Sequence, residues 1–227
     1  MNKLFIIIIF GMNLYSLDII YDQRIPYVKE DKNSISGLVA IPLIKALNEA
    51  NITYTLKNKP SKRHLKEIKA NKKAICAVGW FKNPKREKFA KFTKPLYQDK
   101  PIGILTNINN NIQNNITFDK LFSINNLSVL IKDSYSYGSF IDKKLKKLNI
   151  KKTKASNLNM VSMVAKKRAT FMFISFEEVK EIMKNHKYKN KIKFIQIKDA
   201  PKGNNRYLIC SKLVDDNIIN KLNKGIK

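Results

Sequence analysis

The feature that most constrains the fold is a repeated alternation of short β-type runs and helical runs. The first series reads strand, helix, strand, helix, strand, over residues 18–21, 38–50, 52–56, 65–71 and 74–78. The helical runs carry apolar residues at helical spacing, and the strand runs are rich in β-branched and aromatic residues. Ser61 is placed to cap the second helix. Alternation of this kind predicts an α/β lobe with a mainly parallel sheet.

The pattern restarts after Pro101. Strands are expected over 102–105, 127–131, 170–174, 194–197 and 207–210, and helices over 140–148, over 158–167, from Ser175 onward and over 214–225. The last strand and helix are expected to return to the first lobe. We therefore predict two lobes, one formed by residues 17–100 with 199–227 and the other by residues 101–198.

The N-terminus has the pattern of a secretory signal peptide. A positive start at Met1 to Lys3 precedes an apolar run from Leu4 to Met12, and the small Ser16 follows. The apolar run is about half of the roughly 20 residues that a membrane-spanning helix needs. We expect residues 1–16 to be removed, without a lipid anchor, and the mature chain to be soluble and periplasmic.

The formal net charge of +28 first suggests a nucleic-acid partner. The lysines, however, are spread over every segment, and the chain has no arginine-rich arm and no recognisable nucleic-acid motif. We interpret the charge as a solvated basic surface and expect no nucleic acid as partner. The alternative is a functional attraction to anionic partners, which include acidic ligands and the membrane surface.

Cysteine and histidine offer little material for catalysis or metal binding. Cys76 and Cys210 both lie in apolar strand-like runs, so they form either a disulfide between neighbouring strands or two buried thiols. His64 and His186 are far apart in sequence and flanked by lysines, which predicts surface histidines. We expect no metal, no cofactor and no catalytic residues.

The stretch from Gly79 to Tyr97, GWFKNPKREKFAKFTKPLY, is the strongest candidate for a site. It places the only tryptophan, a loop proline and Arg86 between two apolar runs. The preceding strand is expected to end where this loop begins, and open α/β sheets place ligand sites at such strand ends. An arginine at this position can bind an anion.

Four segments together resemble the extracellular solute-binding proteins of family 3, the type II periplasmic proteins that serve polar amino-acid ABC transporters. They are RIPYVKED, SGLVAIPLIKALNEANITYTL, NPKREKFAKFTKPLYQDKPIGIL and VLIKDSYSYGSFIDKKL. The resemblance covers nearly all of the mature chain and is strongest over Pro84 to Tyr97. It implies two α/β lobes joined by strands, with a solute held in the cleft between them. Members of this family usually continue beyond their final helix. We therefore expect the chain to cover slightly less of the first lobe here than it does in those members.

In amino-acid-binding members, the arginine at the position of Arg86 holds the ligand carboxylate, for which a guanidinium is well shaped. The alternative is an exposed arginine, either solvated or paired with Glu87. Trp80 is expected either to stack on a flat or cationic ligand or to be a core residue. Phe81 and Tyr27 complete the ligand-binding residues expected from the first lobe.

From the second lobe, the resemblance implies Ser134, Tyr135 and Ser136 as an anion-binding helix start, with ordinary N-capping as the alternative. Ser175 stands where amino-acid binders place an aspartate for the ligand ammonium. A buried ammonium without a carboxylate is costly. We therefore do not expect a standard α-amino acid as ligand, unless Glu177, Glu178 or Asp22 takes the place of that aspartate.

The function implied is that of a monomeric, non-enzymatic binding protein, which captures a small carboxylate-bearing or aromatic solute and delivers it to an ABC permease. One alternative is a sensor or partner-presenting receptor. A second is a dehydratase-like enzyme of the same fold, with Glu177 or Glu178 as general acid. Both glutamates are otherwise ordinary helix-start carboxylates that stabilise the helix dipole.

Overall fold

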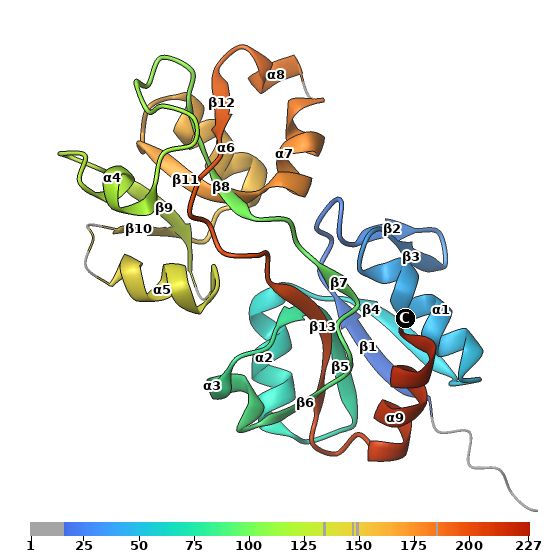
Figure 1. Ribbon diagram of the computed structural model, residues 1–227. Coiled ribbons are helices and arrows are strands. Elements are labelled where there is room, and N and C mark those ends of the chain that lie inside the picture. Colours follow the sequence, from blue (N-terminus) through green and yellow to red (C-terminus); the bar gives the residue numbers. More distant parts are fainter. Residues whose placement is uncertain (1–15, 134, 147, 149, 185) are drawn as a thin grey trace, which may run out of the picture.

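The computed structural model describes residues 16–227, except residues 134, 147, 149 and 185. Its helices and strands form two lobes, each built around one sheet (Figure 1). The predicted signal peptide lies outside the described residues, apart from Ser16. Within the described part of the chain, no helix is long and apolar enough to cross a membrane.

The first lobe contains a six-stranded sheet in the order β4-β1-β5-β13-β6, with β7 also paired to β13. Its strands are β1 (Leu17–Tyr21), β4 (Tyr54–Asn58), β5 (Ile75–Phe81), β6 (Ala90–Phe92), β7 (Tyr97–Gln98) and β13 (Asn205–Ser211). The helices of this lobe are α1 (Ala40–Glu49), α2 (Ser61–Ala70), α3 (Pro84–Glu87) and α9 (Asp216–Gly225). A short hairpin of β2 (Lys29–Asp31) and β3 (Ser34–Ser36) precedes α1.

The second lobe contains a five-stranded sheet in the order β10-β9-β11-β8-β12. Its strands are β8 (Ile102–Asn107), β9 (Val129–Lys132), β10 (Ile150–Thr153), β11 (Phe171–Ser175) and β12 (Ile192–Ile195). Its helices are α4 (Phe118–Phe122), α5 (Ser139–Leu145), α6 (Asn157–Ala165), α7 (Phe176–Met183) and α8 (His186–Lys189).

Each sheet is mainly parallel in strand direction, with one strand, β13 or β8, that runs opposite to the others. The strands joined by helices pair in parallel, namely β1 with β4 and β5, and β9 with β10 and β11. By contrast, β13 is antiparallel to β5 and β6, and β8 is antiparallel to β11 and β12. The reason is that β8 and β13 each arrive directly from the other lobe, without the crossover helix that a parallel neighbour requires.

Two connections carry the chain between the lobes, one from β7 to β8 and one from β12 to β13 (Figure 1). The two connections are in contact: the Asp99 amide of the first donates to the Asn204 carbonyl of the second over 3.0 Å. A Cβ atom on Gly203 would overlap the Asp99 carbonyl, so this close approach requires glycine.

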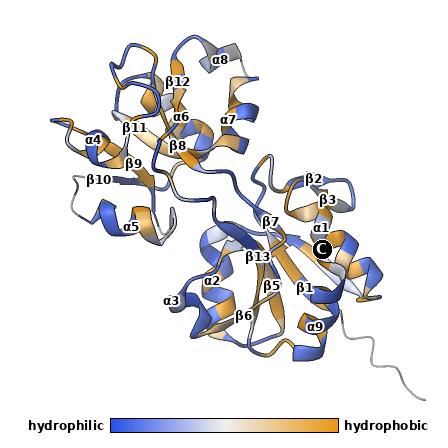
Figure 2. Cartoon of the chain, in the orientation of Figure 1, coloured by the Kyte–Doolittle hydropathy of each residue, from blue (hydrophilic) through white to orange (hydrophobic). Residues whose placement is uncertain are grey.

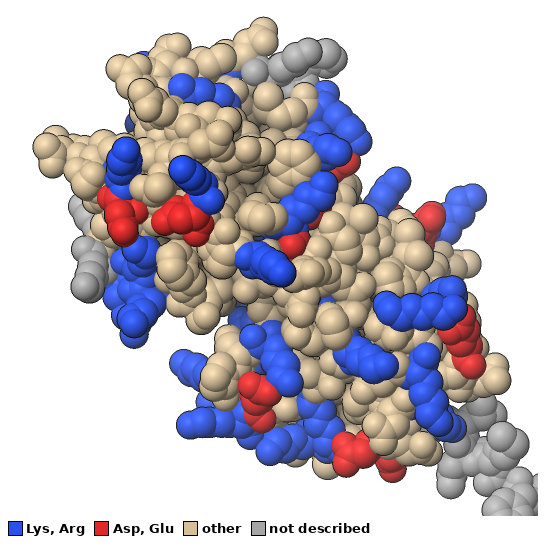
Figure 3. All heavy atoms as spheres, viewed as in Figure 1, with Lys and Arg blue, Asp and Glu red and all other residues tan. Residues whose placement is uncertain are grey.

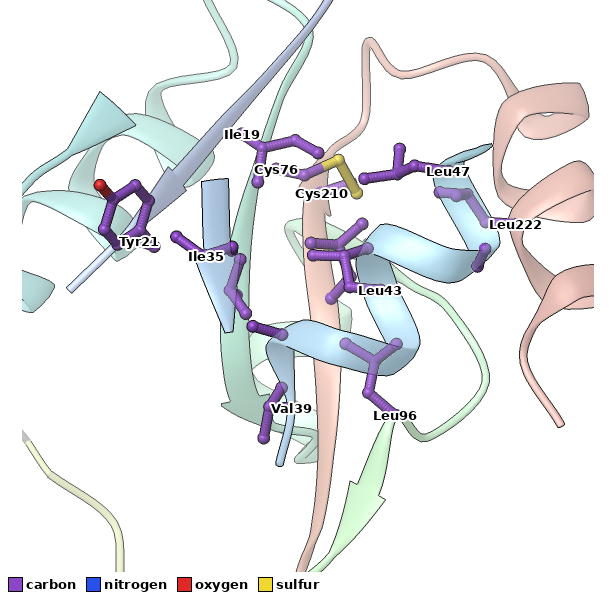
Figure 4. Packing of buried hydrophobic residues seen from close by; sticks show 14 of the residues in the cluster. Ile19, Tyr21, Ile35, Val39, Leu43, Leu47, Cys76, Leu96, Cys210 and Leu222 are labelled. Carbon is purple, nitrogen blue, oxygen red and sulfur yellow. A yellow bond between two sulfur atoms is a disulfide. The ribbon is translucent and has the colours of Figure 1, made fainter. Parts of the chain in front are cut away.

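The core of the first lobe is crossed by a disulfide between Cys76 and Cys210, one of the two alternatives that the sequence left open. The two cysteines are paired in register on the neighbouring strands β5 and β13 and are fully buried. Ile19, Leu43 and Leu222 pack around them from a strand and two helices (Figure 4). Apolar residues are concentrated along the strands, and hydrophilic residues occupy much of the helix surfaces (Figure 2).

Two local predictions at the edge of the cleft are wrong. Pro60, rather than Ser61, is the N-cap of α2 and makes no side-chain cap bond. The Ser61 amide, at the first residue of the helix, donates to the Asp22 side chain instead. The second concerns β5, which continues through Gly79 and Trp80 to Phe81, where a loop was expected. It continues because β13 keeps pairing with it there, Tyr207 opposite Trp80 and Arg206 opposite Phe81.

Candidate ligand-binding cleft

Two adjoining cavities lie between the lobes. The first, which we call the Glu178 cavity, has a volume of about 130 Å³ and is lined by Ser175, Glu178 and residues of both connections. The second, the Arg86 cavity, has a volume of about 70 Å³ and is lined by Trp80, Arg86 and residues at the ends of β1 and β5. The cavities share five lining residues, Arg24, Phe81, Tyr135, Ser136 and Arg206, so they form two compartments of one cleft.

Arg86 is held at the cleft by the first turn after β5. Asn83 caps the short helix α3 and accepts the Arg86 amide over 2.9 Å. One guanidinium nitrogen, Nη1, donates to the Phe81 carbonyl over 2.6 Å, and the guanidinium carbon lies 4.9 Å from the centre of the Trp80 ring. These contacts fix the side chain while leaving its other donors unused by the described residues.

The charge of Arg86 has no carboxylate partner among the described residues, although the residue is only 7% exposed. Glu87 forms an ion pair with Lys82 instead, over 2.9 Å, so the predicted alternative of an Arg86–Glu87 pair does not apply. Burial lowers the pKa of Arg86, and the more distant Asp142 opposes that shift. A buried guanidinium stays protonated. The cavity therefore contains a cation that an incoming anion would stabilise.

Trp80 is partly a core residue and also borders the cleft, and its stacking on a ligand stays a prediction. Its ring packs partly against the Ile20 and Ile68 core and also lines the Arg86 cavity. The indole Nε1 donates to Nδ1 of His64 over 3.2 Å, which leaves Nε2 of His64 to donate to the Lys59 carbonyl over 2.8 Å. His64 is thus buried, at 1% exposed, which corrects the expectation of a surface histidine. The side chain of His186 lies outside the described residues.

Tyr27 and Ser175 connect the two lobes where they border the cleft. The Tyr27 hydroxyl donates to the Ser175 hydroxyl over 2.6 Å, and both residues are buried. Ser175 is also the N-cap of α7, where its oxygen accepts the Glu178 amide over 3.3 Å. The hydroxyls of these two residues therefore bond to each other across the lobes, and both residues also border the cavities.

Glu178 is paired with an arginine from the opposite lobe. Nε and Nη2 of Arg24 donate to its two oxygens over 2.9 and 2.8 Å. Arg24 also lies over the rings of Tyr27 and Tyr135, at 5.5 and 5.3 Å from their centres. Burial by itself would raise the pKa of Glu178, but the charge and hydrogen bonds of Arg24 hold it below its ordinary value. Glu178 is thus an anion across the neutral pH range.

A second ion pair supports the cleft from the connections. Arg206 donates from Nε and Nη2 to the two oxygens of Asp99, over 2.6 and 2.7 Å, and both side chains are buried. The Arg206 guanidinium carbon lies 3.6 Å from the centre of the Tyr27 ring and 4.8 Å from that of Phe81. The guanidinium of this pair thus packs against Tyr27 and Phe81, two of the aromatic residues that the sequence predicted for the site.

The expected anion site at the start of α5 is already occupied by a side chain of the protein. Asp142 accepts the Ser136 hydroxyl over 2.6 Å and the Tyr137 amide over 2.8 Å. Ser136 also accepts the Gly138 amide over 3.3 Å, but the N-cap of α5 is Gly138, and no side chain makes a cap bond there. Tyr135 faces the cleft, and its hydroxyl lies 3.2 Å from that of Ser61 in the other lobe. Ser134 lies outside the described residues.

The other candidate carboxylate, Glu177, lines neither cavity. One of its oxygens accepts the Tyr97 hydroxyl over 2.9 Å and the Lys100 amide over 2.8 Å, and the Tyr27 hydroxyl lies 3.5 Å from the other. Glu177 therefore fastens the first connection to α7.

Sequence reasoning missed Arg24, Asp99 and Arg206 as cleft residues. Arg24 begins the RIPYVKED run that carried part of the resemblance, so its position was visible although its role was not. Nothing in the local pattern marks Arg206, which lies within a strand, or pairs it with Asp99, because 107 residues separate them. The described residues contain no group of three or more metal-binding side chains.

The described chain is similar in structure to several solved proteins. The arginine-, lysine-, histidine-binding protein ArtJ from Geobacillus stearothermophilus is 15% identical, with a TM-score of 0.74 over 93% of this chain and 88% of that one. A histidine kinase sensor domain with similarity to periplasmic binding proteins is 12% identical, with a TM-score of 0.73 over 93% and 88%. The substrate-binding protein of an amino acid ABC transporter is 14% identical, with a TM-score of 0.69 over 93% and 92%.

No family model and no curated protein sequence matches the chain. Identities this low establish the fold and nothing finer. The chain therefore has the two-lobed α/β fold of the substrate-binding proteins of amino acid ABC transporters.

Proposed function

We propose that this protein is a periplasmic solute-binding protein that captures a small carboxylate-bearing solute between its lobes and delivers it to an ABC permease. The observation that carries the proposal is Arg86, a buried cation that borders a cavity without a carboxylate partner among the described residues. A ligand carboxylate matches the guanidinium in charge and shape. The solute-binding fold supports the same function, since transporter binding proteins share it.

The enzyme alternative has less support. A general acid must carry a proton to donate, whereas the Arg24 guanidinium keeps the pKa of Glu178 below its ordinary value. Glu177 lies outside both cavities, with its oxygens accepting from the Tyr97 hydroxyl and the Lys100 amide. We therefore retain a binding protein, without chemistry, as the function.

The sensor alternative is supported by one finding, the likeness to a histidine kinase sensor domain. In a sensor, the same cleft would bind the same class of solute, but closure would be reported to a membrane protein. Co-purification separates the two functions: a permease as partner favours transport, and a receptor or kinase favours sensing.

The test of the binding site is a thermal-shift screen of the purified protein against organic acids, small aromatic acids, amino acids and polyamines. A ligand at 100 times its dissociation constant stabilises the folded state by about 2.7 kcal/mol. For a carboxylate hit, we expect Arg86→Ala to weaken binding by about 2 to 5 kcal/mol, because a charge-assisted pair loses one partner. Arg63→Ala is the matched control, since Arg63 is exposed on α2 and lines neither cavity.

Calorimetric titration of both variants gives the affinities. Equal affinities of Arg86→Ala and the parent protein for the ligand would show that Arg86 does not bind it. A hit confined to polyamines would contradict the proposal for a carboxylate ligand.

A further inference from the structure

The cleft contains a cation that belongs to the protein itself. We propose that Arg24 occupies the cation position beside Glu178 as a built-in cation, so that the protein selects small carboxylates that carry no ammonium group. This inference rests on the proposed function and names the chemical class of its ligand. It also makes Arg24 a residue that determines specificity.

The first step of the argument is that Glu178 has no acceptor capacity left. Its Oε1 accepts from Nε of Arg24 over 2.9 Å and from the side-chain amide Nδ2 of Asn157 over 2.5 Å. Its Oε2 accepts from Nη2 of Arg24 and from the Ser175 hydroxyl over 2.8 and 3.1 Å. The glutamate side chain is only 5% exposed. A carboxylate oxygen offers about two acceptor positions, so a ligand ammonium finds none here.

The second step is that the other carboxylates bordering the cleft are also engaged. Both oxygens of Asp99 accept from the buried Arg206. Asp22, at the mouth of the Arg86 cavity, accepts the Ser61 amide at the first residue of α2 over 3.1 Å. It is half-buried and is thus the one competitor for a ligand cation.

The third step compares the arginines. Three of them border the cavities, and Arg24 and Arg206 each hold a carboxylate with two hydrogen bonds. Arg86 has no carboxylate among the described residues. Since a buried charge requires a partner, the cleft lacks one negative charge beside Arg86. Among the described carboxylates that line the two cavities, only Asp22 has an oxygen left for a positive charge. An anion without an ammonium group would pair with Arg86 and bring no second positive charge into the cleft.

Chemical rescue tests the role of Arg24 without knowledge of the natural ligand. Arg24→Ala removes the guanidinium and leaves its space beside Glu178. We expect millimolar guanidinium ion to raise the thermal midpoint of Arg24→Ala, relative to the same concentration of sodium chloride. We expect no rise for the parent protein, whose site is filled, or for Arg24→Ala/Glu178→Gln, which lacks the carboxylate.

An unresponsive Arg24→Ala protein, or an equal response from the parent protein, overturns the assignment of Arg24. If Arg24→Ala does not fold, Arg24→Gln provides the same comparison with a larger side chain retained. Arg63→Ala, at an exposed position away from both cavities, controls for the loss of an arginine.

Matched ligand pairs test the selection itself. Propionate with alanine, and 3-phenylpropionate with phenylalanine, differ only by the ammonium group. We expect the parent protein to bind the member without it more tightly, and Arg24→Ala to shift the ratio of dissociation constants at least tenfold toward the amino acid. Tighter binding of the amino acids by the parent protein overturns the proposal, and Asp22→Asn then tells whether Asp22 holds their ammonium.

The two proposals fail in different ways. If the parent protein binds no carboxylate, the proposed function fails, while guanidinium rescue still decides whether Arg24 fills a cation site. If carboxylates bind through Arg86 and Arg24→Ala responds to neither guanidinium nor amino acids, only the inference about Arg24 fails.

Discussion

Among single residues, His64 shows how the cleft wall sets the state of a side chain. Its two ring nitrogens are both used, one as acceptor from Trp80 and one as donor to the Lys59 carbonyl. Burial lowers its pKa from the ordinary value of 6.5, against the opposing hydrogen bond to Lys59. The neutral ring thus fixes the indole on which the Arg86 guanidinium stacks.

This state predicts a pH dependence of stability. In the unfolded chain His64 takes up a proton below about pH 6.5, whereas the folded protein resists it, so the unfolded state binds more protons. The free energy of unfolding should therefore fall as the pH drops from 6.5, by no more than about 1.4 kcal/mol per pH unit for one proton. Urea denaturation at several pH values measures this slope.

His64→Gln is the matched variant, because glutamine supplies a donor and an acceptor but does not titrate. Its stability curve should be flatter than that of the parent protein between pH 6.5 and 5. Glu178 contributes a separate loss, because its pKa is below the ordinary 4.5 in the folded state, so that loss begins only at lower pH. Parallel curves for the two proteins would show that His64 is not the group responsible.

Among the elements, β5 and β13 form the part of the first lobe that borders the candidate site. Gly79, Trp80 and Phe81 lie at the end of β5, and Arg206 lies opposite Phe81 on β13. The Cys76–Cys210 disulfide joins the same two strands across 134 residues of chain. It thereby links β5 to β13, the strand that returns from the second lobe.

Removal of this link should cost stability. We expect Cys76→Ala/Cys210→Ala to lower the free energy of unfolding by about 2 to 5 kcal/mol, because the unfolded chain regains freedom and the core loses packing. Guanidinium chloride denaturation with and without reductant measures the change. Reductant should destabilise the parent protein and leave the double variant unchanged. A parent protein with two titratable thiols after unfolding without reductant would contradict the disulfide.

For the whole molecule, side-chain bonds between the lobes hold the cleft shut. They include Arg24 with Glu178, Tyr27 with Ser175, and the exposed pair of Lys62 with Asp133 at 3.1 Å. The basic residues do not gather at one place on the drawn face, where lysines and arginines are spread over both lobes (Figure 3). Closure therefore depends on a few specific bonds, two of them ion pairs, and the drawn face shows no concentrated charge patch that would add to them.

Loss of these bonds should open the molecule. We expect Tyr27→Phe/Glu178→Gln to have a larger radius of gyration than the parent protein in small-angle X-ray scattering, because the lobes touch through these groups. A compact single domain of this length has a radius of gyration of about 17 Å, which is the lower limit for comparison. Arg63→Ala should scatter like the parent protein. Identical profiles for all three would show that other contacts set the closure.

The sequence by itself determined the elements and the class of fold. Period and composition predicted the strands that became β1, β4, β5, β8, β9 and β11 and the helices that became α1, α6, α7 and α9, to within a few residues. Such patterns are local, since they report which face of one element is buried. Short elements such as β2, β3 and β10 escaped, because three or four residues carry too little periodicity.

Only the tertiary structure decided what the cleft contains. Arg86 was visible as a candidate because its neighbours in sequence are also its neighbours in space, through Asn83 and Phe81. The Arg24–Glu178 pair spans 154 residues and two lobes, so no window of the sequence contains both partners. A charge is paired or free according to which groups folding brings within hydrogen-bond distance, and that depends on the whole chain.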